Sequence, residues 1–382
     1  MICPARPGAP QRHAYCAILA LALSGVARLG GAASDPTKAD GQDSVEPAQA
    51  VSVGSNFVVA PIPISNPSVG SGLALTGMWL YQMDDESPAS STALGAGYLS
   101  SGTWLVGAGE KLNFDADRYR LNAALGLGQI NYTFFGVGAD STSTGIPLEQ
   151  KVLGGMLDFR RQLLPSLHVG LRYTYATVQT SLGAPAGELA PVLVGKELDI
   201  TIAGLGPVAS WDTRDRQFSP RTGTYIEFKS NFADSAFGSD LSYQTYSLAW
   251  NAYYTVDAPN VVAARIYLCK ASDSAPFFDT CAYGSGSDLR GYEAGRYRDR
   301  NLIAAQAEYR RQLSSRFGAV AFAGIGSVAG SFGDLFSAPA LPSGGIGLRY
   351  LAVPAQGVNI SVDYAWGKSG SSGLYVYIGD SF

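Results

Sequence analysis

Apolar and polar side chains alternate with a period of two along most of the chain after about residue 56. Between residues 244 and 256, one face of the expected strand carries Tyr246, Leu248, Trp250, Ala252, Tyr254 and Val256. The segments 302–310 and 358–366 alternate in the same way. Strict alternation indicates β-strands with one apolar and one polar face. Aromatic residues at the strand ends of the apolar face, opposite a small and charged face, are typical of a barrel with lipid outside and a polar lumen.

The pattern predicts an all-β fold, a single transmembrane antiparallel β-barrel of about 16 strands. The expected strands cover residues 56–65, 70–83, 91–101, 103–112, 117–131, 148–162, 167–180, 197–211, 222–234, 239–256, 260–271, 301–313, 316–329, 343–352, 357–367 and 373–382. The longest connection, about residues 272–300, is expected outside the cell, which places both chain termini on the periplasmic side because the strands alternate in direction.

Composition agrees with a membrane barrel and excludes other classes. Only 15% of the residues are charged, well below the ~25% of soluble domains. The net charge of −4 gives no basic surface for nucleic acid. No run of 18 or more apolar residues follows the N-terminus, so a helical span is not expected. A closed barrel is the other fold that satisfies every backbone group in lipid.

The N-terminus has the pattern of an export signal. Arg6 and Arg12 precede an apolar run at 17–26, and small residues follow at 30–33. We therefore expect a signal peptide over 1–33, with a short membrane anchor as the alternative. Residues 34–55 are polar and aperiodic and predict a flexible periplasmic tail. The outer-membrane barrel is expected over 56–382.

Four cysteines are present, and two of them, Cys3 and Cys16, belong to the signal segment. Cys269 and Cys281 remain and stand just before the longest connection. An exported protein meets an oxidising compartment, which favours a disulfide between them. Two free thiols are the alternative.

The longest connection ends in a dense charge cluster, LRGYEAGRYRDRN at residues 289–301. Unpaired charges cannot face lipid, because burying one in hydrocarbon costs several kcal/mol. The cluster is therefore either a solvated surface loop or a loop folded back into the lumen. We favour the folded-in loop.

The first expected strand carries Pro61 and Pro63. Residues two apart present their N–H groups to the same neighbour, so these prolines remove donors from one edge, and proline belongs on edge strands. In a closed barrel that edge meets the last strand, which ends at Phe382. We expect a weak seam involving Pro61, Pro63 and Phe382.

Four strings in the chain resemble one family. Leu289–Tyr292 is similar to the RGY/RGF signature in the long extracellular loop of BamA/TamA-type outer-membrane proteins, the bacterial surface antigen superfamily. The other strings are WDTRD at 211–215 with SPRTG at 219–223, GIGLRY at 345–350, and VDYA at 362–365. The final Phe382 resembles the C-terminal signal that barrel-assembly machinery reads.

The resemblance implies a loop lock in the lumen formed by Arg290, Gly291 and Tyr292. The family's FxDxG motif corresponds to residues 322–326, where Gly324 replaces the acid that usually meets the loop arginine. The partner must then come from another lumen-facing position. The candidates for this carboxylate are Asp363 and Glu308, and Arg349 is a further candidate lumen partner.

Family members that insert or secrete proteins carry POTRA domains before the barrel, and residues 34–55 cannot hold one. The resemblance therefore implies the short class without POTRA domains. Its partners would be outer-membrane lipid and lipopolysaccharide, and the barrel-assembly machinery during its own insertion. A separate periplasmic partner stays open.

Catalytic chemistry is sparse. His168 is the sole histidine after the signal segment, and it is expected beside Arg172 on the lumen face. A nucleophile needs a positioned base, and no such spacing is present. No Cys/His cluster has the spacing of a zinc site. We expect no enzyme, no cofactor and no metal.

Two functions remain open for a bacterial outer-membrane protein of this kind. The first is assistance to protein or lipid translocation or insertion, which the first-strand prolines favour. The second is a passive pore, transport channel or structural barrel without insertase activity, which the missing periplasmic module favours. A barrel enzyme is the third and weakest hypothesis.

Overall fold

The structure is a computed structural model that describes residues 56–66, 70–134, 136–138, 146–182, 199–284, 288–293 and 295–382. The expected signal peptide and periplasmic tail, residues 1–55, lie outside the described residues. Within the described ranges, no helix has the length and apolar character needed to cross a membrane.

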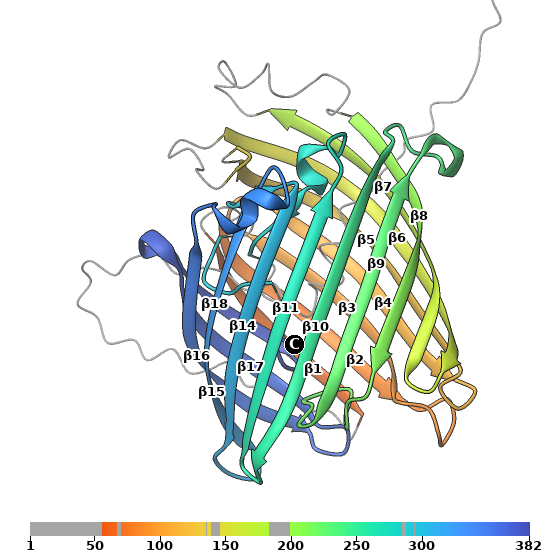
Figure 1. The fold of residues 1–382 in the computed structure, drawn as a ribbon, viewed down its shortest axis with the longest axis vertical. Helices are drawn as coiled ribbons and strands as arrows, with labels where there is room; N and C mark the ends of the chain where they lie inside the picture. The colour runs from red at the N-terminus through yellow and green to blue at the C-terminus, as the bar shows by residue number, and fades with distance from the viewer. Residues whose placement is uncertain are drawn as a thin grey trace, which may run out of the picture.

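One antiparallel sheet of 16 strands curves into a barrel, and every strand pairs with its neighbours in the chain (Figure 1). The strands are β1 (Phe57–Asn66), β2 (Gly70–Tyr81), β3 (Ser90–Leu99), β4 (Trp104–Phe114), β5 (Tyr119–Phe134), β6 (Ile146–Leu164), β7 (Leu167–Leu182), β8 (Asp199–Asp212), β9 (Gly223–Ala233), β10 (Tyr243–Asp257), β11 (Asn260–Ala271), β14 (Asn301–Gln312), β15 (Phe317–Ala329), β16 (Leu341–Val353), β17 (Val358–Trp366) and β18 (Ser372–Ile378). The predicted all-β barrel of 16 strands is confirmed.

Short irregular elements occupy the connections. The longest connection contains a pair of antiparallel strands of two residues each, β12 (Cys281–Ala282) and β13 (Arg298–Asp299), which the alternation pattern did not predict. The described 3-10 helices are η2 (Ser235–Phe237), η3 (Phe277–Asp279), η4 (Gly333–Phe336) and η5 (Lys368–Gly370).

The two faces of the sheet differ as the alternation predicted. Large apolar side chains are exposed on the outer face, among them Leu94, Leu125, Leu171, Tyr254 and Leu348. The lumen face buries charged side chains, among them Asp158, Arg160, Glu308, Arg349 and Asp363. An apolar outer belt around a charged interior is the arrangement that a bilayer requires of a barrel.

The two ends of the barrel are distinguished by their connections. At one end, five of the seven connections are turns of two to four residues, at 115–118, 165–166, 258–259, 313–316 and 354–357, and the other two are 82–89 and 213–222. The longest connection, residues 272–300, lies at the other end. Outer-membrane barrels have short periplasmic turns and longer extracellular loops, so we assign the short-turn end to the periplasm.

The barrel closes by overlap where β1 meets β18. The hydrogen-bonded order starts at β1 and stops at β18, and in the described residues no ladder joins these two strands. The inward side chains Ile62 and Ile64 of β1 pack on Val376, which lies on the outward face of β18. The other face of β18 carries Tyr375 and Tyr377, which are also buried. The last strand, β18, therefore lies on the lumen side of β1, and both of its faces are buried.

The free edge of β1 carries the two prolines. Leu80 donates its backbone N–H to the carbonyl of Asn56, so even-numbered residues of β1 occupy the hydrogen-bonded positions toward β2. Odd-numbered residues, including Pro61 and Pro63, direct their backbone groups to the opposite edge. That edge faces the seam, and it lacks two N–H donors.

Phe382 does not lie on the seam, contrary to expectation. β18 ends at Ile378, and Gly379 adopts a φ of 95°, a left-handed conformation that glycine tolerates. The last residues turn into the lumen, where the Phe382 ring packs with Tyr253 and Ala263. Figure 1 marks the C-terminus within the outline of the barrel.

We expect backbone amides in 372–378 to exchange with solvent deuterium faster than those in 301–312, because no strand among the described residues pairs with one edge of β18. Hydrogen–deuterium exchange on the folded barrel measures this. Equal protection in both segments would contradict an unpaired seam.

Candidate functional site

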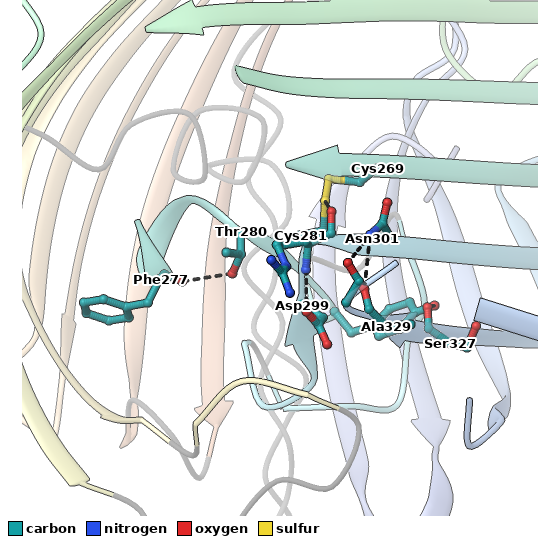
Figure 2. The surroundings of a disulfide bond; sticks show 11 residues. Cys269, Phe277, Thr280, Cys281, Asp299, Asn301, Ser327 and Ala329 are labelled. Atoms are coloured by element: carbon teal, nitrogen blue, oxygen red, sulfur yellow. Dashed lines mark hydrogen bonds between the residues drawn. A yellow bond between two sulfur atoms is a disulfide. The ribbon is translucent and has the colours of Figure 1, made fainter. Parts of the chain in front are cut away.

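The long loop, residues 272–300, starts at a covalent anchor. A disulfide joins Cys269 of β11 to Cys281 of β12 (Figure 2), the pairing expected from the sequence. Cys281 also pairs with Asp299 across the β12–β13 hairpin. On the next strand, Asn301 donates from Nδ2 to the carbonyls of Ala329, at 3.3 Å, and Gly330, at 3.0 Å. These contacts fix both ends of the loop to the same region of the wall.

From this anchor one arm of the loop reaches β5. The ring of Phe277 lies 5.0 Å from that of Phe134, centroid to centroid. Arg298 donates from Nη1 to the carbonyl of Phe277 at 3.0 Å, and its own carbonyl accepts from the N–H of Gly138 at 2.7 Å. The loop therefore contacts β5 and the start of the following connection, as well as its own β11 and β14.

Asp279 buries a carboxyl group in this arm. Tyr243 donates its hydroxyl to Asp279 Oδ2 at 2.6 Å. Burial raises the pKa of Asp279 to about 6, although the Tyr243 hydrogen bond acts in the opposite direction. The ionised form is therefore disfavoured in the folded loop.

The tip of the loop delivers Arg290 to the strands at the C-terminal side of the barrel. Its side chain is fully buried, and its guanidinium donates to Asp363 of β17 and to Glu308 of β14. Gln306 accepts a third, longer contact at 3.4 Å. The ring of Phe322 lies beneath the guanidinium, 3.5 Å from its carbon to the ring centroid. Both candidate carboxylates thus bind the same arginine.

Gly291 and Tyr292 hold the backbone of the tip. Gly291 has a φ of 102°, and a Cβ there would approach the carbonyl of Trp366 to 2.7 Å, so a side chain is excluded. Its N–H donates to the Tyr375 hydroxyl at 2.8 Å. Tyr292 donates its hydroxyl to the carbonyl of Pro342 and accepts from the N–H of Lys368. Gly291 and Tyr292 therefore contact β16, β18 and the connection between β17 and β18, and Arg290 adds β14 and β17 to the contacts of the expected loop lock.

The structure explains why Gly324 needs no carboxylate. A Cβ at Gly324 would lie 2.7 Å from Leu289 Cδ1 and 2.8 Å from the carbonyl oxygen of Ala305. Leu289 itself is fully buried. An apolar side chain next to Arg290 fills the space above Gly324, and neighbouring strands supply the negative charge.

Arg290 belongs to a larger charge cluster, which we call the lumen network and define as Arg290, Glu308, Arg310, Arg349, Asp363 and Asp380. Arg349, the third candidate, is a second cation on Asp363 and also donates to Asp380 at 3.0 Å. Arg310 bridges Glu308, at 2.8 Å, and Asp380, at 3.1 Å. Three arginines therefore meet three carboxylates, which compensates the charges inside the lumen.

The network ties the chain end to the loop, which sequence reasoning missed. Besides Asp380, Arg310 binds the carbonyl oxygen of Phe382 at 2.8 Å. Tyr377 donates to Asp363. The Gly379–Asp380 pair is a turn signal, and it was the one available sign that the last strand ends early.

The other predicted polar residues lie apart from the network. His168 is fully buried near the periplasmic end, with Nε2 2.6 Å from the carbonyl of Asp117. Asp158 binds Arg160 at 2.7 Å, and Arg172 lies 3.7 Å from the same carboxylate. Within the described ranges, no group of three or more His, Cys, Asp or Glu is arranged to hold a metal ion.

A barrel of 16 strands with a charged lumen and an extracellular loop bound inside it defines a class of outer-membrane protein. The chain belongs to the Omp85 superfamily, because the family model described as the Omp85 superfamily domain matches residues 91–382. Proteins of this family with BamA- and CdiB-type barrels reside in the bacterial outer membrane, and so does this one.

Solved structures show the same fold at low identity. BamA from Haemophilus ducreyi lacking POTRA domains 1–3 is 13% identical with a TM-score of 0.54, over 85% of this chain and 69% of that one. CdiB from Acinetobacter baumannii is 11% identical with a TM-score of 0.55, over 84% and 59%. CdiB from Escherichia coli is 13% identical with a TM-score of 0.59, over 85% and 63%. This chain thus spans only part of their lengths. No curated protein matches it.

We expect Arg290→Ala to release the loop tip, because it leaves Glu308 and Asp363 buried beside fewer cations, a loss of about 3–5 kcal/mol. The folded barrel should lose heat resistance on semi-native gels, and protease should cut faster between Cys281 and Asn301. Arg300→Ala is the matched control in the same loop. Arg300 pairs with an Asp273 that is 90% exposed, so its loss should cost about 0–1 kcal/mol. Arg290→Ala without effect in either assay would contradict a loop held by this residue.

Asp279 makes the docking of the loop pH-dependent. Its folded pKa of about 6 lies above the ordinary 3.8, so the folded state holds the proton more tightly and stability falls as pH rises from about 4 to 6. The contribution is up to about 3 kcal/mol. Relative to Asp279→Asn, the Tm of the native protein should fall across this window and level off above it. A constant difference in Tm from pH 4 to 7 would contradict the prediction.

Proposed function

We propose that this protein assists the insertion or translocation of polypeptides at the seam between β1 and β18. The observation that carries the proposal is the overlap of these strands without a hydrogen-bonded ladder in the described residues. An unpaired strand edge is a template for adding another strand. Moving β18 aside would expose this edge of β1 to the membrane.

The chemistry of the β1 edge supports a temporary contact. Pro61 and Pro63 remove two donors, while their carbonyls remain as acceptors. A strand added here would gain fewer hydrogen bonds than one added to a complete edge, so it could leave again. The same deficit weakens a permanent ladder with β18.

The position of the long loop favours lateral passage of a polypeptide through the seam and disfavours diffusion of solutes through the lumen. The loop contacts β5 through Phe277 and reaches Asp363 of β17 through Arg290, so it crosses the lumen. A passive channel or a purely structural barrel is the competing function. Ion conductance in planar bilayers distinguishes the channel, and lack of any effect on client folding distinguishes the structural barrel.

We further propose that lipid and lipopolysaccharide surround the barrel and that barrel-assembly machinery inserts it. The apolar outer belt supports the first proposal, and membership of the Omp85 superfamily supports the second. A separate periplasmic partner would supply client delivery. We also propose a non-enzymatic role, which the buried position of His168 supports, because Nε2 already meets the carbonyl of Asp117.

The test locks the seam. Cysteines at Ile62 and Val376, which share one apolar cluster, would join β1 to β18 when oxidised. In liposomes, the native protein should accelerate the folding of an eight-stranded test barrel diluted from urea by several-fold, and oxidation of the seam pair should return the rate to that of empty liposomes.

The matched control is a pair of cysteines at Ala307 and Ala323, register partners on the paired strands β14 and β15. Both residues are exposed on the outer face, so a disulfide there adds a cross-link without closing the seam. Acceleration should survive in the control. Acceleration that survives the seam lock, or a native protein without any acceleration, would exclude the proposed function.

A further inference from the structure

The outer face of the barrel carries one carboxylate that the charged lumen does not explain. Glu110 of β4 has the same parity as Trp104 and Val106, which are exposed to lipid. Its carboxylate accepts from the Tyr81 hydroxyl at 2.6 Å and from Thr92 Oγ1 at 2.7 Å. No ion pair of Glu110 occurs with the described lysines and arginines. An ionisable side chain on a lipid-facing wall calls for a partner.

The partners of Glu110 form a row across three strands. Trp79 of β2 is opposite Thr92 of β3, and Thr92 is opposite Glu110 of β4. The rings of Trp79 and Tyr81 lie 5.1 Å apart, centroid to centroid, and Trp79 is 54% exposed. A carboxylate beside an exposed aromatic ring is the combination that recognises an organic ammonium group, by charge and by cation–π attraction.

The depth of the row is that of lipid headgroups. Glu110 lies four residues before the end of β4 at Phe114, next to the short turn 115–118 at the periplasmic end. Phe114 and Tyr119 stack at this level, with centroids 5.6 Å apart. Aromatic residues mark the interface between hydrocarbon and headgroups.

An apolar groove of about 310 Å³ lies on the same face, over the next strands β5, β6 and β7. The row through Glu110 continues to Ala123 of β5 and Leu157 of β6, so the row meets the groove at Leu157, about 10 Å from the carboxylate. It is lined by Leu125, Leu153, Gly155, Leu157, Tyr173 and Tyr175. Leu125, Leu153 and Tyr175 lie beyond the row in the direction away from the periplasmic turns, toward the middle of the membrane.

We propose that this wall binds one phospholipid of the inner leaflet whose headgroup carries a primary ammonium group. The ammonium group meets Glu110 beside the contacting rings of Trp79 and Tyr81, and an acyl chain follows the groove toward the membrane centre. The small side chains at Ala123 and Gly155 leave room between headgroup and chain. An anionic headgroup would be repelled by the carboxylate, which sets the selectivity.

The experiment measures which lipid stays with the protein. The full chain is folded into an equimolar mixture of dioleoyl phosphatidylethanolamine and dioleoyl phosphatidylglycerol, extracted in mild detergent, and its retained lipids are quantified by native mass spectrometry. We expect about tenfold more phosphatidylethanolamine than phosphatidylglycerol, the scale of one charge-assisted contact. Glu110→Gln should bring the ratio near one.

The matched control is Tyr309→Phe, which removes a lipid-facing hydroxyl on β14 that donates to Asn260 at 2.7 Å and should leave the ratio unchanged. Heat-dependent gel mobility reports whether each variant has folded. Should Glu110→Gln fail to fold, a photoreactive acyl chain on phosphatidylethanolamine must label peptides of β5–β7 in the native protein. Equal retention of both lipids, an unchanged ratio in Glu110→Gln, or labelling elsewhere would overturn the proposal and show that Glu110 serves only Tyr81 and Thr92.

Discussion

The structure depends on charge compensation in a space that excludes both lipid and bulk water. Arg290 enters this space on a loop, with Asp363 and Glu308 as its acceptors and the ring of Phe322 beneath it. A lone guanidinium there would be prohibitively costly, and so would two lone carboxylates. The cation and the anions therefore stabilise each other's burial, and the path of the loop follows from that requirement.

The same requirement orders the chain end. Arg310 and Arg349 share the carboxylates of Arg290 and also hold Asp380, so the residues after Gly379 are drawn inward. This inward turn ends β18 at Ile378. The loop and the chain end are thus parts of one electrostatic arrangement.

Alternation sufficed to predict the barrel because a period of two is a local property that each strand displays by itself. It also placed Glu308 and Asp363 on the lumen face, and the family string singled out Arg290. It did not predict that Phe382 leaves the wall, because Arg310, which holds it, is 72 residues away in the chain. Nor could it predict that Leu289 fills the space above Gly324, since that depends on how the loop enters the lumen.

The separation of Arg290 from its acceptors gives the loop a role in the order of assembly. Glu308 follows it by 18 residues and Asp363 by 73. Before β17 joins the sheet, Arg290 has only one of its two carboxylate partners, so burial of the loop is less stable. Stable docking of the loop therefore requires that the C-terminal strands are already paired in register.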